Sequence, residues 1–269
     1  FKEEYIMAFK LGDVIIDRAQ FGYGQTKAGV PLYALTQLKE FSIEITADST
    51  DITDARGNLV YRKYTGKKGE VTAQNAFMNL AVISAIAATD AEIATDENTI
   101  VMPVLTTVKA GETLNIEGYV KDSVVVSGIY NGALGTQYTL AAAGAATKTE
   151  FAISDNVLTP PTADGETEYF VKYMKNVKSG AKVTINGKDY PKAHELFVKA
   201  LAVDPCDKGN FRAAVIHISD FMPSPEVTLA LTGGDSQTMD YKGSILTDSC
   251  STGQTMVEVY FIDEVEEDA

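Results

Sequence analysis

The hydrophobic pattern along most of the chain has a period of two. Residues 41–46 alternate strictly, with apolar side chains at Phe41, Ile43 and Ile45 and polar side chains between them. This period predicts a strand with one face on a core and the other in water. Runs rich in β-branched and aromatic residues recur at 11–25, 32–38, 59–65, 100–108, 123–130, 136–140, 168–174, 195–203, 211–219 and 254–262. The chain is therefore predicted to be mainly β.

One stretch has a helical period instead. Apolar and small residues recur at spacings of three and four between Ala73 and Ala87, which predicts a helix over residues 72–88 with Thr72 as its N-cap. The flank of this helix carries three amide side chains, Gln74, Asn75 and Asn79. Because a helix of about four turns is marginal alone in water, we expect its apolar face to lie against the sheets.

A polar turn separates the strand at 41–46 from the strand at 59–65. Its predicted tip is Arg56-Gly57-Asn58, and Asp48, Asp51 and Asp54 precede the tip at regular spacing. The spacing does not fit an EF-hand, because the loop has no glycine at its sixth position and no glutamate at its twelfth. Local side-chain to backbone hydrogen bonds explain these aspartates better than a calcium site does.

The middle of the chain contains a weak internal sequence repeat that suggests an inserted β module. Residues 108–118 and 177–187 each run from a turn into an alternating strand that ends in glycine. We therefore expect a core formed by residues 1–100 and 190–269, and a β-rich insert, possibly a separate subdomain, at residues 101–189. The 269 residues are 45% hydrophobic, which is ample for such a core.

Charge and hydropathy exclude several classes of protein. Lys and Arg number 23 against 37 Asp and Glu, a formal charge of −14, which argues against a surface that grips nucleic acid through its phosphates. No apolar run reaches the roughly 18 to 20 residues needed to span a bilayer, and the first residues do not resemble a secretory signal, so we expect no membrane association. Met7 is a candidate start of translation, since residues 2–4 are what a translated ribosome-binding site would encode.

The chain offers few groups for catalysis or metal binding. It has no nucleophile elbow, zinc-protease or Walker motif, and we predict neither a catalytic site, nor a metal site, nor a cofactor. Of its two histidines, His194 and His217, the second shares a strand face with Val215 and is interpreted as a packed or rim residue. Cys206 and Cys250 are interpreted as free thiols, with a disulfide between them as the alternative.

Several segments together resemble the tail tube proteins (major tail proteins) of bacteriophages. The resemblance rests on F-S-I-E-I-T-A-D-S-T-D-I-T-D-A-R-G-N-L-V, on K-K-G-E-V-T-A-Q-N-A-F-M-N-L, and on the closing P-S-P-E-V-T-L-A-L-T-G-G-D-S-Q-T-M-D-Y-K-G-S-I-L and M-V-E-V-Y-F-I-D. These cover about half the chain. The inner tubes of contractile injection systems share the same plan.

The resemblance implies a β-sandwich or barrel-like core with one flanking helix. Copies would join edge to edge into hexameric rings, and the rings would stack into a virion tail tube that conducts the genomic DNA at ejection. Assembly would take place in the host cytoplasm, with other tail proteins such as terminator, baseplate or sheath as partners. By analogy, the expected lumen-lining residues are Glu44, Asp48 and Asp51, and the expected inter-subunit residues are Gln74, Asn75, Asn79, Asp54 and Arg56.

Two other classes of function compete with a tube. A capsid-decoration or adhesion protein could use the same β modules without forming a tube, and an enzyme could use a dispersed acid site. The state of assembly separates the first from a tube protein, and a rate abolished by one carboxylate substitution would identify the second.

Overall fold

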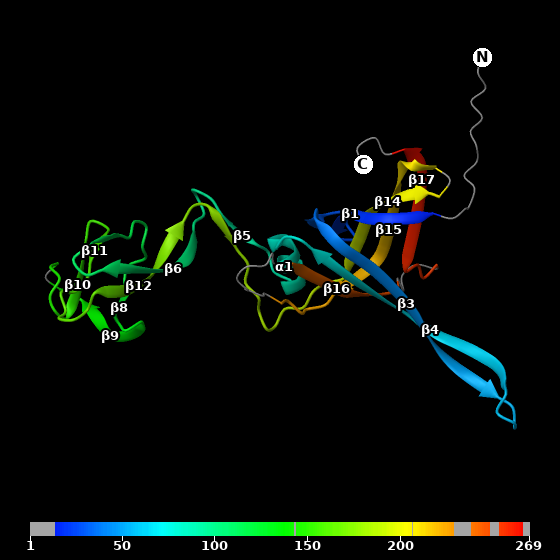
Figure 1. Ribbon diagram of the computed structural model, residues 1–269, viewed down its shortest axis with the longest axis horizontal. Helices are drawn as coiled ribbons and strands as arrows, with labels where there is room; N and C mark the ends of the chain where they lie inside the picture. Colours follow the sequence, from blue (N-terminus) through cyan, green and yellow to red (C-terminus); the bar gives the residue numbers. More distant parts are fainter. Residues whose placement is uncertain (1–13, 143, 206, 229–237, 248–252, 266–269) are drawn as a thin grey trace, which may run out of the picture. The chain divides into compact units, whose positions relative to one another are not determined.

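The computed structural model describes residues 14–142, 144–205, 207–228, 238–247 and 253–265, and its regular structure is mostly β (Figure 1). This confirms the predicted fold class of a mainly β protein with one helix. The helix is α1 (Leu80–Ala87). The strands are β1 (Ile15–Gln25), β2 (Pro31–Leu35), β3 (Leu38–Thr53), β4 (Leu59–Asn75), β5 (Glu92–Ala94), β6 (Ile100–Lys109), β7 (Leu114–Asn115), β8 (Val125–Tyr130), β9 (Ala133–Leu140), β10 (Glu150–Ser154), β11 (Val157–Thr159), β12 (Glu168–Val177), β13 (Gly180–Lys182), β14 (His194–Asp204), β15 (Asp207–Pro223), β16 (Met239–Ile245) and β17 (Val257–Val265).

The chain divides into two compact units, each with its own core. The first unit comprises residues 1–91 and 183–269, and the second comprises residues 92–182. The separate functional roles expected for residues 1–100 with 190–269 and for residues 101–189 stay predictions.

One nearly closed sheet forms the first unit. Its strands follow the order β2-β1-β14-β15-β16-β4-β3. β15 also pairs with β17, through residues 212–218, whereas β16 pairs with residues 221–223 of β15. The ladder between β15 and β16 is only three residue pairs long, from Phe221 with Ile245 to Pro223 with Gly243. The sheet therefore folds over at this point. Its inward side chains form one core that includes Leu35, Val71, Leu196, Ile218 and Tyr241.

The predicted helix begins eight residues too early, because residues 72–75 belong to strand β4. Val71, Ala73 and Asn75 are buried and alternate with Thr72 and Gln74, which is the period of a strand. β4 pairs with β3 on one side and with β16 on the other, so the two ladders satisfy the backbone of this segment. The helical spacing of small residues was a weaker constraint than these two ladders.

Asn79, and not Thr72, is the N-cap of α1. Its Oδ1 accepts hydrogen bonds from the backbone N–H groups of Ala81 at 2.9 Å and Val82 at 3.3 Å, and its Nδ2 donates to the carbonyl of Ala34 at 2.7 Å. The helix ends at Ala88, which has a positive φ of 52°. Its buried side chains, Val82, Ile83, Ile86 and Ala87, pack on the core. The predicted helix flanking the sheets is thus present, but shorter.

The second unit is a smaller β module. Its sheet has the order β6-β12-β8-β9-β10-β11-β7, and the longest ladder pairs β12 with β6 over ten residue pairs. Val126, Leu158, Tyr169 and Val171 are fully buried in its core. The chain enters and leaves this unit through β5 and β13, which pair with each other.

The N-cap gives a direct test of the corrected helix boundary. Asn79→Ala removes the acceptor for two helix N–H groups and the donor to Ala34, so we expect the free energy of unfolding to fall by about 1–2 kcal/mol. Thr72→Val is the control: it keeps a β-branched side chain on an exposed strand position, and we expect a change below about 0.5 kcal/mol. Urea unfolding of the monomer measures both. An equal loss in the two variants would show that the helix starts at residue 72.

Candidate functional site

The outward face of the first unit carries a row of large side chains across four strands. Tyr23 on β1 lies opposite Phe197 on β14, which lies opposite His217 on β15, which lies opposite Glu258 on β17. The alternation along β14 turns Phe197 outward because Leu196 and Val198 point into the core. The rings of Phe197 and His217 stack with centroids 4.3 Å apart.

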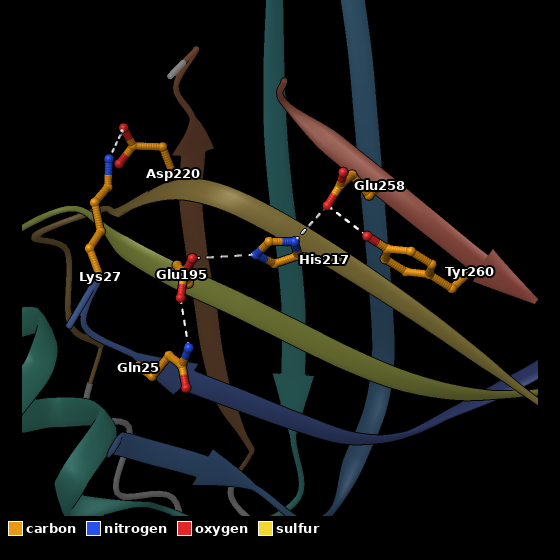
Figure 2. Close-up of polar contacts among 7 residues, drawn as sticks. All are labelled: Gln25, Lys27, Glu195, His217, Asp220, Glu258 and Tyr260. Atoms are coloured by element: carbon orange, nitrogen blue, oxygen red, sulfur yellow. Dashed lines mark hydrogen bonds and ion pairs between the residues drawn. The ribbon is translucent and has the colours of Figure 1, made fainter. Parts of the chain in front are cut away.

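Polar contacts join the same four strands (Figure 2). Gln25 Nε2 donates to Glu195 at 2.6 Å, and His217 Nδ1 lies 2.9 Å from a carboxylate oxygen of Glu258. His217 Nε2 lies 3.7 Å from Glu195, which is an ion-pair distance but not a hydrogen bond. The hydroxyl of Tyr260 donates to Glu258 at 2.9 Å.

This polar row places His217 between two carboxylates at the rim of the sheet. Its side chain is 17% exposed, and Val215 lies on the same face, as the sequence predicts for a rim histidine. The hydrogen bonds from His217 and then from Tyr260 hold the pKa of Glu258 below its usual value, and the same contact with Glu258 raises the pKa of Tyr260.

A second polar group is buried in the core between β2, β14 and β16. His194 Nδ1 lies 3.1 Å from the carbonyl oxygen of Lys192, so Nδ1 carries the proton of the neutral ring and Nε2 is an acceptor. The hydroxyl of Tyr33 donates to Nε2 at 2.7 Å and, in turn, accepts from the hydroxyl of Tyr241. All three side chains are buried in the first unit.

Burial keeps this group neutral. Desolvation lowers the pKa of His194, opposed by the hydrogen bond to Lys192 and the charge of Asp220. The same effect raises the pKa values of Tyr33 and Tyr241. The three residues therefore form a closed set of neutral hydrogen bonds that connects strands from distant parts of the sequence.

The contacts of the two histidines are with tyrosines, glutamates and the backbone. In the described part of the chain, the printed contacts of His194 and His217 go to tyrosine hydroxyls, glutamates and one backbone carbonyl, and no serine or thiol nucleophile is among them. No group of three or more His, Cys, Asp or Glu side chains in the described ranges has the geometry to hold a metal ion. Cys206 and Cys250 lie outside the described residues. Among those residues, no helix has the length and apolarity that crossing a membrane requires.

The residues expected to line a lumen lie on β3 but do not share one face. Glu44 and Asp48 point to one side of β3, and Asp51, an odd number of residues away, points to the other. Asp48 pairs with Lys68 at 3.0 Å, and Asp51 accepts two hydrogen bonds from Arg62, which lower its pKa. Their role in a lumen stays a prediction.

Glu44 differs from the two aspartates because a like charge faces it. It lies directly opposite Glu70 on β4, and both side chains are exposed. No cation contacts either carboxylate within the described residues. Two like charges in cross-strand register repel each other, so this pair is a local concentration of negative charge.

The amide residues expected at a subunit contact have different surroundings. Gln74 is outward and donates to Asp240 at 3.0 Å. Asn75 is only 3% exposed: it accepts from the backbone N–H of Gln37 and donates to the carbonyl of Phe77. Asn79 caps α1. Their contacts with another copy stay predictions.

Asp54 and Arg56 form the turn between β3 and β4, as predicted. Asp54 Oδ1 accepts from the backbone N–H groups of Arg56 and Asn58, both at 2.8 Å. The hydrogen bond from the side-chain amide of Asn58, and then these backbone bonds, lower the pKa of Asp54. Gly57 completes the turn with a φ of 84°. This confirms the local hydrogen bonding expected for Asp54, and the side chain of Arg56 remains exposed.

Sequence reasoning missed the row across β1, β14, β15 and β17 and the buried group around His194. The residue that contacts Gln25 is 170 positions away, and Tyr241 is 208 positions from Tyr33. The outward alternation of Glu195, Phe197 and Lys199 was a usable signal for a shared face. The partners of that face could not be identified from alternation alone.

Comparison with protein families gives a match over most of the chain. A family model described as the YomU/Tube protein family matches residues 13–259. The match spans both structural units and reaches into β17. A search of curated proteins found no match.

The buried histidine predicts a loss of stability in mild acid. The pKa of His194 is lower in the folded state than the value near 6.5 of the unfolded chain. The unfolded state therefore binds more protons, and the stabilisation present above about pH 6.5 is lost as the pH falls through the folded-state pKa.

Melting temperatures measured from pH 7.5 to pH 5 provide the test. We expect a decrease with acid in the wild type and in His217→Gln, and a clearly smaller decrease in His194→Gln, whose melting temperature is lower throughout. The chain has two histidines, so these variants divide the histidine contribution between them. An unchanged slope in His194→Gln would contradict the assignment.

Proposed function

The chain belongs to the YomU/Tube protein family, and from this premise we propose that it polymerises as stacked rings into the tail tube of a phage. A structural tail tube protein assembles into a multimeric tube together with other tail proteins. We further propose that the rings are hexameric, that the tube is the conduit for DNA ejection, and that copies assemble in the host cytoplasm.

The observation that supports this proposal best is an unpaired sheet edge. Among the described residues, β17 pairs only with β15, so one side of its backbone lacks ladder partners. Val259 on this strand is 51% exposed, and Tyr260 and Phe261 are also exposed. An apolar edge strand is a template for pairing with another chain, and a ring of copies would cover it.

Part of β1 also lacks a ladder partner on one side. β2 pairs with only the last residues of β1, so Ile15–Phe21 have a ladder partner on β14 alone within the described residues. Ile15 and Ile16 are about half exposed. Because β1 contacts β3, this stretch lies where the sheet nearly closes, and β17 is the edge that favours pairing with another copy.

The acidic pair on β3 and β4 supports a DNA conduit. We propose that Glu44 faces the lumen together with Glu70 and that Asp48, on the same side of β3, lies along the same wall, whereas Asp51 points to the other side of the strand. Because Lys68 and Arg62 neutralise the two aspartates, the net negative charge is at Glu44 and Glu70. Such a wall repels phosphate and leaves DNA free to slide.

Assembly is the first test of this function. We expect the purified chain to form long hollow tubes in negative-stain images and Val259→Arg to remain a folded monomer, because the cation blocks the β17 edge. Val101→Arg, a similar change at an exposed valine of the second unit, should assemble normally. Wild-type protein that stays monomeric or forms only closed trimers would contradict the tube and favour a decoration or adhesion protein.

The lumen assignment has a separate test in phage particles. Glu44→Lys with Glu70→Lys should still assemble, since both positions are exposed, but should slow DNA ejection because cations on the wall attract phosphate. Glu112→Lys with Glu117→Lys makes the same charge change at exposed sites of the second unit and should leave ejection unchanged. Unchanged ejection in the first variant would place the lumen wall elsewhere.

A further inference from the structure

We propose that His217 and the two carboxylates beside it, Glu195 and Glu258, form a pH-sensitive switch that controls how firmly β17 is held against β15. Protonation of the ring holds the strand in place, and loss of the proton loosens it. The effect on β17 belongs to the single chain. Its consequence for assembly rests on the function proposed above, in which β17 pairs with another copy.

β17 has few apolar contacts that hold it in position. Its ladder within the described residues is with residues 212–218 of β15 alone. On its inward side Val257 packs on the core, but Val259 and Phe261, which follow on the same side, remain exposed. Apolar burial therefore contributes little beyond Val257. The contacts of the outward side chains, Glu258 above all, then matter more for the position of the strand.

The His217 ring is held between two carboxylates that come from different strands. Nδ1 lies 2.9 Å from Glu258 on β17, and Nε2 lies 3.7 Å from Glu195 on β14 (Figure 2). Nε2 is buried and has no hydrogen-bond partner among the described residues. The ring also stacks on Phe197 with an interplanar angle of 5°. Rotation of the ring away from the carboxylates would break this stacking.

These surroundings suit the protonated ring better than the neutral one. A neutral imidazole has one N–H and one lone pair, so it donates to one carboxylate and turns the lone pair toward the other. The imidazolium donates from both nitrogens, and its charge attracts both Glu195 and Glu258. The hydrogen bond from His217 is the main reason that the pKa of Glu258 lies below its usual value, so Glu258 is ionised in both states of the switch.

The other charged or titratable groups around the ring do not reverse this preference. Tyr260 on β17 donates to Glu258, and Gln25 on β1 donates to Glu195, so both leave the carboxylates ionised. Lys199 on β14 opposes protonation, but it lies opposite Val215, two residues along from the Phe197–His217 pair, whereas both carboxylates lie within 4 Å of the ring. The remaining groups on this side are Tyr23 on β1 and the ion pair of Asp220 on β15 with Lys27.

Loss of the proton therefore weakens the contact that holds β17 on its outward face. Two ionised carboxylates then flank a neutral ring, and the lone pair repels one of them. Glu258 moves most readily, because it belongs to the strand with the fewest other contacts. The edge of β17 is then no longer held in line for another copy. Because histidine takes up its proton near pH 6.5 in an unfolded chain, the change falls in a range where most other side chains keep their charge.

Hydrogen exchange of the single chain tests the switch directly. At concentrations below that needed for assembly, and after correction for the intrinsic exchange rate, protection of the amides of residues 257–261 should fall about fivefold or more from pH 6 to pH 8.5. The fall should follow the titration of the His217 ring in ¹H–¹⁵N spectra. Amides of β4 should show no such change.

Three variants separate the switch from a general effect of pH. His217→Gln can still donate to Glu258 but cannot take up a proton, so β17 should lose its pH dependence. Glu195→Gln supplies a donor to the neutral ring and should reduce the dependence. His194→Gln removes the other histidine and should leave the dependence of β17 unchanged. Equal pH dependence in the wild type and His217→Gln, or none in the wild type, would overturn the switch.

Sedimentation measures the consequence for assembly. The concentration of wild type needed for assembly should rise about fivefold or more from pH 6 to pH 8.5, and that of His217→Gln should change clearly less. The comparison is needed because acid also reduces the general repulsion between acidic copies. Assembly with the same pH dependence in both proteins would overturn the proposed control of assembly. Failure of the wild type to form tubes at any pH would instead overturn the proposed function, and hydrogen exchange of the single chain would still decide the switch.

Discussion

The hydrogen-bonded group of Tyr33, His194 and Tyr241 connects the parts of the first unit that the sheet ladder joins least. β15 and β16 share only three residue pairs, so backbone hydrogen bonds contribute little where the sheet folds over. The two tyrosines and the histidine come from β2, β14 and β16 and meet inside the core. A fully satisfied polar group in an apolar core fixes the register of the elements around it, because any shift leaves a buried donor or acceptor unpaired.

The first unit has a packed, hydrogen-bonded core but strand edges without ladder partners. The inward apolar side chains pack in the core, and the inward polar side chains form buried hydrogen bonds. The backbone groups on one side of β17, in contrast, have no ladder partner among the described residues, and Val259, Tyr260 and Phe261 on this strand are exposed. An exposed apolar edge strand is typical of a surface that pairs with another chain. The proposed contact between copies would cover this edge.

The sequence predicted the local strands well and the distant contacts poorly. The strand at Phe41 and Ile43 and the turn at Arg56-Gly57-Asn58 depend on neighbouring residues and were confirmed by β3 and β4. Ile45 was predicted on the core face and is instead 49% exposed, because the ribbon leaves the core near this residue. The helix start was wrong because small residues from Ala73 onward fit a helical period as well as a strand, and only pairing with β16 and β3 decides between them. Phe77, an apolar residue within the predicted helix, lies before α1 and is 63% exposed. The family resemblance was correct, since it draws on turn and strand order together.

The net charge of the chain does not describe how charge is distributed over its surface. A total of −14 suggested one acidic protein that repels DNA, but the structure separates an uncompensated Glu44–Glu70 pair from the paired strands of residues 46–68, which carry a formal +2. Acidic surfaces on two copies repel one another over about a Debye length, near 8 Å at physiological salt. Contacts between copies must therefore be close, because only burial of apolar surface and direct ion pairs can outweigh this repulsion.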